Sequence, residues 1–114
     1  MFKTGSYTEL VTVFVLMEMM MVRQRVINAR NTQLDRQGKS NRFLSNKEIE
    51  AYCKLSAPDE ALLAQIIEKF RLSARAYHRI LKVARTIADL AQSNEIQTAH
   101  LSEAVSYRAM DQAK

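Results

Sequence analysis

Cysteine, proline, glycine and tryptophan are scarce in this sequence, whose 114 residues include one cysteine, one proline, two glycines and no tryptophan. Cys53 cannot form a disulfide within the chain, and no Cys-x-x-Cys pair or Cys/His cluster predicts a metal site. So few prolines and glycines leave few turns for a β fold. We therefore expect one all-α domain with an aliphatic core, located in a reducing cytoplasm.

The sequence also lacks a hydrophobic run long enough to cross a membrane. The longest apolar stretch, residues 10–22, is about half to two-thirds of the roughly 20 residues that a spanning helix needs, and Glu18 interrupts it. No small-x-small cleavage site follows, which argues against a signal peptide. We predict a helix here, no membrane partner, and self-association through the apolar side chains between Leu10 and Val22.

Acidic residues are absent from the longest amphipathic stretch, between Lys69 and Ala88. We predict a helix that begins after Ser73, whose hydroxyl caps the first turn, and that ends near Gln92. Its apolar residues follow the helical period and predict a side that faces the core: Tyr77, Ile80, Leu81, Ala84, Ile87, Ala88 and Ala91. Its basic residues fall elsewhere and predict an exposed basic face: Arg71, Arg75, Arg79, Lys82 and Arg85.

The start of this helix can hold an anion, because its N–H groups and positive dipole end face outward and Arg75 adds a planar fork suited to phosphate. The same pattern is typical of a solvated helix face, and the pattern alone does not decide between the two. The formal net charge of +5 suits an anionic partner, whether nucleotide phosphate, nucleic acid or an acidic protein surface.

A second basic region lies between Arg23 and Lys47, with Asp35 as its only acidic residue. We predict a helix over residues 22–37 that ends at Gly38 as the C′ residue. The apolar side of this helix is thin: Val22, Val26, Ala29 and Leu34. Such a helix bridges elements and fills little of a core.

Three shorter helices are predicted from their capping residues. Ser45 and Glu48 form a capping box, Ser56 caps the following helix, and Thr98 caps the last one. Asp59 is explained by the positive end of its helix. The helix after Ser56 has the broadest apolar face and is expected to be central to the core: Leu62, Leu63, Ile66, Ile67 and Phe70.

Catalytic arrangements are missing. The triplet GKS at residues 38–40 spells the end of a phosphate-binding loop, but Gln33 stands where that motif needs its first glycine, and no strand precedes it. His78 and His100 are interpreted as boundary and surface residues, and Cys53 as a small buried hydrophobe. We therefore expect no catalytic residue in this chain.

The stretch LSARAYHRILKVARTIADLA at residues 72–91 resembles the sensor-2 helix of AAA+ ATPases. Around it, VRQRVINARNTQLDRQGKSN, LSNKEIEAYCKL and IQTAHLSEAVSYR resemble, in the same order, the C-terminal domain of the magnesium-chelatase-related ComM/YifB family. This implies a basic connecting helix and linker at 22–44 and a helical lid domain at 45–111. Residues 1–21 fall outside the resemblance, and we interpret them as a remnant of truncation or cloning.

In this family a nucleotide binds between a P-loop core and a small helical lid. The resemblance therefore implies an all-α helical bundle of the AAA+ lid type, with a protruding N-terminal helix. It implies that Arg75 is the sensor-2 arginine, which contacts the terminal phosphates, and that Ser73 lies beside it. Arg85 is expected to point elsewhere and to be dispensable. Three further basic residues are candidates for contacts with a neighbouring subunit or with DNA: Arg79, Arg71 and Lys82.

For the whole protein the resemblance implies a hexameric ring that uses ATP and magnesium and drives DNA branch migration in competence and recombination. Its partners would be the rest of the ATPase core, neighbouring subunits and DNA. Walker A and Walker B motifs are absent from this sequence, so we expect this chain alone to bind no cofactor and to be no enzyme. The alternative is a stand-alone basic helical module that binds DNA or a self-associating adaptor.

Overall fold

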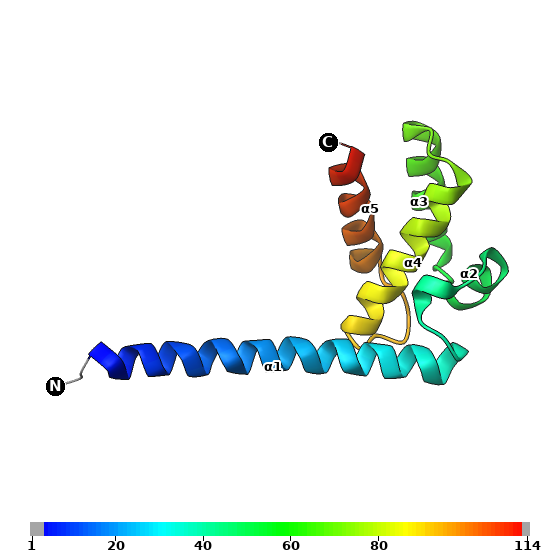
Figure 1. Ribbon diagram of the computed structural model, residues 1–114. Helices are drawn as coiled ribbons and strands as arrows, with labels where there is room; N and C mark the ends of the chain where they lie inside the picture. Colours follow the sequence, from blue (N-terminus) through cyan, green and yellow to red (C-terminus); the bar gives the residue numbers. More distant parts are fainter. Residues whose placement is uncertain (1–3, 113–114) are drawn as a thin grey trace.

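The computed structural model describes residues 4–112, with side chains described for residues 7–108. Within that range every regular element is a helix, which confirms the predicted all-α class. In chain order the elements are α1 (Thr4–Gln37), the 3₁₀ turn η1 (Asn41–Phe43), α2 (Asn46–Tyr52), α3 (Ala57–Phe70), α4 (Ala74–Leu90) and α5 (Thr98–Gln112). Figure 1 shows α2 to α5 standing as a small bundle on the C-terminal half of α1, while the N-terminal half of α1 extends past them.

Helix α4 forms the centre of the bundle, because it contacts α1, α2, α5 and η1. The Ser73 hydroxyl accepts a hydrogen bond of 3.1 Å from the Ala76 N–H, which confirms the predicted cap. Most of the predicted apolar side is buried. Ala84 and Ala88 have no exposed surface, and Ile80 and Leu81 are each 2% exposed. This side supplies much of the core that the other helices share.

Helix α1 is one continuous helix, so the predicted helix over residues 22–37 and the helix expected in the apolar segment before it are the same element. Residues 1–3 of the segment 1–21 lie outside the described part of the chain. Gly38 ends α1 as predicted, with a φ of +75° and its N–H bonded to the Leu34 carbonyl at 2.9 Å.

The thin apolar side predicted for α1 is largely exposed, as expected of a helix that fills little of the core. Ala29 is buried, but Val22, Val26 and Leu34 are each more than two-fifths exposed. The polar Gln33 is buried instead, and its side-chain oxygen accepts a hydrogen bond of 2.9 Å from the Asn41 N–H. The reason is geometric, because α1 crosses the end of α4 and only a short part of it is covered.

Helix α2 begins with the capping box that the sequence predicts. The Ser45 hydroxyl accepts from the Glu48 N–H, and the Glu48 carboxylate accepts from the Ser45 N–H. That carboxylate also accepts a hydrogen bond of 2.8 Å from the Lys39 ammonium, and these bonds lower the pKa of Glu48 to about 2. Ile49 of α2 and Cys53, which follows it, are buried, in line with the interpretation of Cys53 as a small buried hydrophobe.

The prediction that α3 is central to the core is wrong. Ser56 caps α3 as expected, but Leu63 is the one residue of its broad apolar face that is fully buried. Leu62 is 37% exposed and Phe70 is 59% exposed. Because α4 occupies the centre, α3 lies at the side of the bundle, and its apolar face is wider than the surface it packs against.

Helix α5 does not use Thr98 as its cap, contrary to the prediction. Its first backbone bonds run to the Gln97 carbonyl, and the Gln97 N–H donates to Nδ1 of His100, which is half-buried. The Thr98 hydroxyl instead donates a hydrogen bond of 2.7 Å to Asp59 of α3. Asp59 is 5% exposed, so it joins two helices and does more than offset a helix dipole. Leu101 of α5 is fully buried in the core.

Candidate functional site

The start of α4 is an exposed basic turn. Arg71 ends α3 in the left-handed region, with a φ of 51°, and its N–H donates to the Glu68 carbonyl. This sharp turn leads directly to Ser73, which caps α4, and to Arg75, the second residue of the helix. Arg71, Ser73 and Arg75 are all exposed, and we call them the α4 start.

The charge of the α4 start is not neutralised by ion pairs among residues 7–108, whose side chains are described. The ion pairs there join Arg36 and Arg85 to Asp89, and Lys39 to Glu48. In a capped helix the N–H groups of the first two residues also point outward. The α4 start therefore offers backbone donors, a positive dipole end and free guanidinium groups to an anion. Which ligand uses them stays a prediction.

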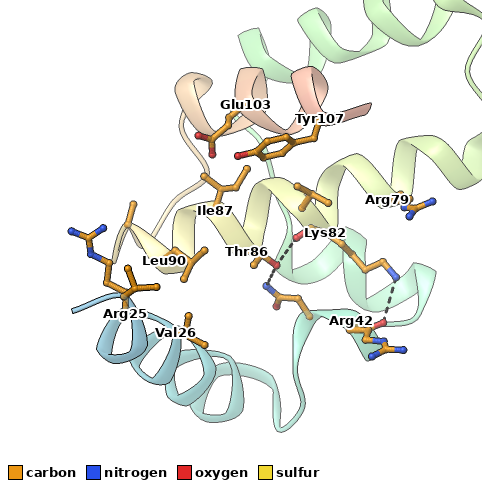
Figure 2. A pocket seen from close by; sticks show the side chains of 14 residues that line it. Arg25, Val26, Arg42, Arg79, Lys82, Thr86, Ile87, Leu90, Glu103 and Tyr107 are labelled. Atoms are coloured by element: carbon orange, nitrogen blue, oxygen red, sulfur yellow. Dashed lines mark hydrogen bonds between the residues drawn. The ribbon is translucent and has the colours of Figure 1, made fainter. Parts of the chain in front are cut away.

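Arg79 and Lys82 lie in a different place, on a groove of about 780 Å³ between α1, α4 and α5. We call it the α1–α4–α5 groove. Figure 2 shows Arg79, Lys82 and Arg42 toward one end of it and Arg25 toward the other. The Lys82 ammonium donates to the Arg42 carbonyl at 3.4 Å. The floor of the groove is mainly apolar: Val22, Val26, Val83, Ile87, Leu90 and Tyr107. The five predicted site residues are thus divided between two surfaces.

Arg85 is not on the exposed basic face, and the prediction that it is dispensable loses its basis. Its side chain is 4% exposed, and it forms an ion pair of 3.0 Å with Asp89 one turn further along α4. Its remaining donors reach the carbonyls of Asn94 at 3.0 Å and Ser93 at 2.7 Å. Arg85 therefore holds the loop after α4 in place.

Asp89 is the centre of a buried polar network that the sequence did not predict. Its carboxylate is 2% exposed and accepts hydrogen bonds from Arg36, Arg85 and Asn41 at 2.9 to 3.1 Å. Burial alone would raise the pKa of Asp89, but the hydrogen bonds from Arg36 and Asn41 and the charges of Arg85 and Arg36 lower it below its usual value. One feature of the sequence indicates part of this network: Arg85 and Asp89 are four residues apart, so they lie one turn apart on the same side of a helix.

Cys53, His78 and Lys39 carry side chains that can take part in chemistry, but their contacts give each of them a structural role. Cys53 is 2% exposed, and burial raises the pKa of its thiol to about 11, as suits an unreactive hydrophobe. His78 is half-buried and packs edge-on against Tyr77 with ring centres 5.4 Å apart. The GKS triplet follows a helix, and its Lys39 is bound to Glu48.

The described residues contain neither a metal-ligand cluster nor a membrane-spanning helix. No group of three or more His, Cys, Asp or Glu side chains among them converges as metal ligands would. None of the helices described has both the length and the apolar character that crossing a membrane requires.

Comparison with known proteins gives a family match over most of the chain. The pattern described as magnesium chelatase, subunit ChlI C-terminal, matches residues 17–108. The chain is 52% identical over 89 residues to the competence protein ComM of Haemophilus influenzae, and 51% identical over 90 residues to the YifB protein of Escherichia coli K12. The YifB protein of Salmonella typhimurium is 48% identical over 90 residues. These matches cover 78% to 79% of this chain but 18% of each relative.

Proposed function

Because the chain belongs to the family of magnesium chelatase ChlI C-terminal domains, we propose that it is the helical lid of a ring-forming AAA+ ATPase of the ComM/YifB type. In this proposal residues 45–111 are the lid, and 22–44 connect it to an ATPase core in the rest of the protein. The observation that supports nucleotide sensing is the α4 start, where Ser73 caps the helix and Arg75 is exposed, with no acidic partner among the side chains of residues 7–108.

Arg75 is suited to sensing a terminal phosphate. Its guanidinium and the outward N–H groups of the first turn of α4 favour the same anion, because both present positive charge and hydrogen-bond donors. When bound, ATP with its magnesium ion supplies the phosphoryl group that is transferred. The buried core of α4 makes the helix rigid, so Arg75 can be held in position while the lid moves as one body.

For the whole protein we propose an ATP-driven ring that remodels DNA by branch migration in competence and recombination. The name of the Haemophilus influenzae relative, competence protein ComM, supports the process. Arg71, and Arg79 and Lys82 at the α1–α4–α5 groove, are the residues that we propose for contacts with a neighbouring subunit or DNA.

The test is ATP turnover by the full-length protein with Arg75→Ala. Exposed helix positions usually tolerate alanine within about 0.5 kcal/mol, so the lid should stay folded. If the guanidinium stabilises charge on the transferring phosphoryl group, turnover should fall on the order of tenfold or more.

The matched control is Arg30→Ala, which removes an exposed arginine from α1, away from the α4 start. We expect it to change turnover less than about twofold, because general positive charge at a distance is screened by salt. Both variants should be measured at the same ionic strength. Equal losses from the two substitutions would show that only general charge matters and would overturn the proposal.

A further inference from the structure

The apolar floor of the α1–α4–α5 groove continues along several turns of α4. Val83, Ile87 and Leu90 follow one another at intervals of four and three residues, and each of them is half-buried. From Arg79 to Leu90, the residues of α4 that line the groove cover about 16 Å along the helix axis. An apolar surface thus stays partly open over a length that matches about three turns of a second helix.

Basic side chains stand at both ends of this floor. Figure 2 shows Arg79, Lys82 and Arg42 toward one end and Arg25 toward the other. None of the four forms an ion pair with another side chain among residues 7–108. Among the described residues that line the groove, Glu103 of α5 is the one acidic residue. The rim is therefore positive overall and favours a partner that carries negative charge.

Arg108 of α5 adds positive charge at the Arg79 end. Its side chain lines a smaller hollow together with Arg79, Val83 and Tyr107, which also line the groove. Arg108 forms no ion pair with any side chain in the range 7–108. Two arginines therefore border one hollow, and a carboxylate placed there would be attracted by both.

An apolar floor between charged ends fits a protein helix better than it fits DNA. Phosphate contacts use basic and polar side chains, and a duplex laid over Val83, Ile87 and Leu90 would cover them with no apolar surface of its own. An amphipathic helix in a groove buries apolar side chains at positions i, i+3 or i+4 and i+7, while its charged side chains reach the rim. The floor and the rim together therefore favour a helix.

We propose that the α1–α4–α5 groove binds an amphipathic helix of a partner protein, whose apolar stripe has a carboxylate at each end. One carboxylate contacts Arg79 and the other contacts Arg25. The two carboxylates are about 11 residues apart, because the floor is about 16 Å long. The assignment rests on the proposed function of Arg79 and Lys82, a contact with a neighbouring subunit or DNA, and narrows it to a protein helix. Nucleotide sensing by Arg75 is not involved, so either can fail alone.

The probe is a synthetic helical peptide with glutamates at its first and twelfth residues, leucines at its fifth, eighth and ninth, and alanine and glutamine elsewhere. This spacing places the five side chains on one side of the helix. Fluorescence anisotropy of the labelled peptide, titrated with the full chain at physiological salt, should give a dissociation constant of about 100 μM or tighter. Weaker binding would overturn the proposal.

A second peptide tests the apolar floor. It has alanines in place of the three leucines and keeps both glutamates, so the charge is unchanged and the apolar side chains are lost. We expect it to bind about tenfold more weakly or worse, because the floor is then left uncovered. Equal affinity for the two peptides would show that charge alone attracts them, which is incompatible with a helix seated in the groove.

Two matched double variants locate the site. Arg25→Glu with Arg79→Glu reverses the charge at both ends and should weaken binding of the first peptide about tenfold or more, since like charges then face one another. Arg30→Glu with Lys47→Glu makes the same change in net charge at two exposed residues that do not line the groove. We expect this control to weaken binding by less than about threefold. Equal losses in the two proteins would overturn the proposed site.

An exchange of charges completes the test. A peptide with lysines in place of its two glutamates should bind the Arg25→Glu/Arg79→Glu protein more tightly than it binds the wild type, because the ends are again complementary. Binding of this peptide also shows that the variant is folded. Failure of the exchange would contradict the pairing of the peptide ends with Arg25 and Arg79.

Duplex DNA of about 20 base pairs tests the alternative partner. Binding of DNA through general charge should fall by the same factor in both double variants, because their net charges are equal. A loss confined to the Arg25→Glu/Arg79→Glu protein would make the groove a nucleic-acid contact and would overturn the proposal.

Discussion

Arg36, in the last turn of α1, and Asp89, in the last turn of α4, are 53 residues apart in the sequence and form two side-by-side hydrogen bonds of 2.9 and 3.1 Å. A planar guanidinium and a carboxylate fit one another in this way, which fixes direction as well as distance. Asn41 and Arg85 donate further hydrogen bonds to the Asp89 carboxylate. The pair therefore sets how α1 crosses α4, the helix that carries Arg75.

Replacing Arg85 tests the stability of the helical bundle. Arg85→Ala should lower the free energy of unfolding by about 3 kcal/mol, because it removes one partner of a buried ion pair and three hydrogen bonds with it. Urea denaturation followed by circular dichroism measures this change. Arg79→Ala is the matched control on an exposed turn of α4 and should change stability by less than about 0.5 kcal/mol. Similar small losses from both would contradict a structural role for Arg85.

Acid should weaken the network around Asp89. Its pKa is lowered in the folded protein, so the stability it contributes is fully present above the unfolded pKa of about 3.9 and is lost as pH falls through the lower folded value. The loss should therefore fall below about pH 4. The difference in stability between the wild type and Asp89→Asn isolates the contribution of Asp89, because Glu48, whose pKa is also lowered, titrates in both proteins. Parallel stability curves for the two proteins between pH 5 and pH 2 would count against this assignment.

The bond between Thr98 and Asp59 should matter for the packing of α5 against α3. Thr98→Val removes the hydroxyl donor and leaves the buried Asp59 carboxylate with one partner fewer, at a cost of about 1 to 2 kcal/mol. Thr98→Ser keeps the hydroxyl and should cost less than half as much. Thermal unfolding of the two variants measures the difference. An equal loss would mean that the methyl group of Thr98, and not its hydroxyl, carries the effect.

The isolated chain should bind ATP weakly. The α4 start supplies one or two charged hydrogen bonds of about 1.5 to 3 kcal/mol each before the costs of association, which falls short of the roughly 8 kcal/mol of a micromolar complex. Isothermal titration calorimetry at physiological salt should detect no micromolar binding and no hydrolysis. A micromolar dissociation constant would show that the basic surface holds a complete site.

Predictions that depend on local chemistry were the successful ones. The caps at Ser45, Ser56 and Ser73 and the stop at Gly38 are formed by residues within a few positions of each helix end, so the sequence displays them directly. The same holds for the inward side of α4 as far as Ala88, because it follows the 3.6-residue period, whereas Ala91 lies past the helix end and is exposed. The α4 start was found in this way, because Ser73 and Arg75 need no distant partner to be exposed.

Predictions that required knowledge of neighbouring elements were the unsuccessful ones. Arg85 has the same spacing and charge as the exposed basic residues before it, and only the loop carbonyls and Asp89 distinguish it. Thr98 is a suitable cap by type, but Asp59 of another helix takes its hydroxyl. The broad face of α3 indicated a central helix, yet a helix is central only if others surround it.

The sequence by itself determined the all-α class, the helix ends marked by Ser45, Ser56, Ser73 and Gly38, the family and the apolar character of residues 10–22, because each depends on composition, short-range spacing or similarity along the chain. The tertiary structure decided which charges are available. It buried Arg85 and paired Arg36 with Asp89, left Arg75 exposed, and moved Arg79 and Lys82 to a separate groove. The physical reason is that pairing and desolvation depend on which atoms meet in space, and residues that are far apart in the sequence supply those atoms.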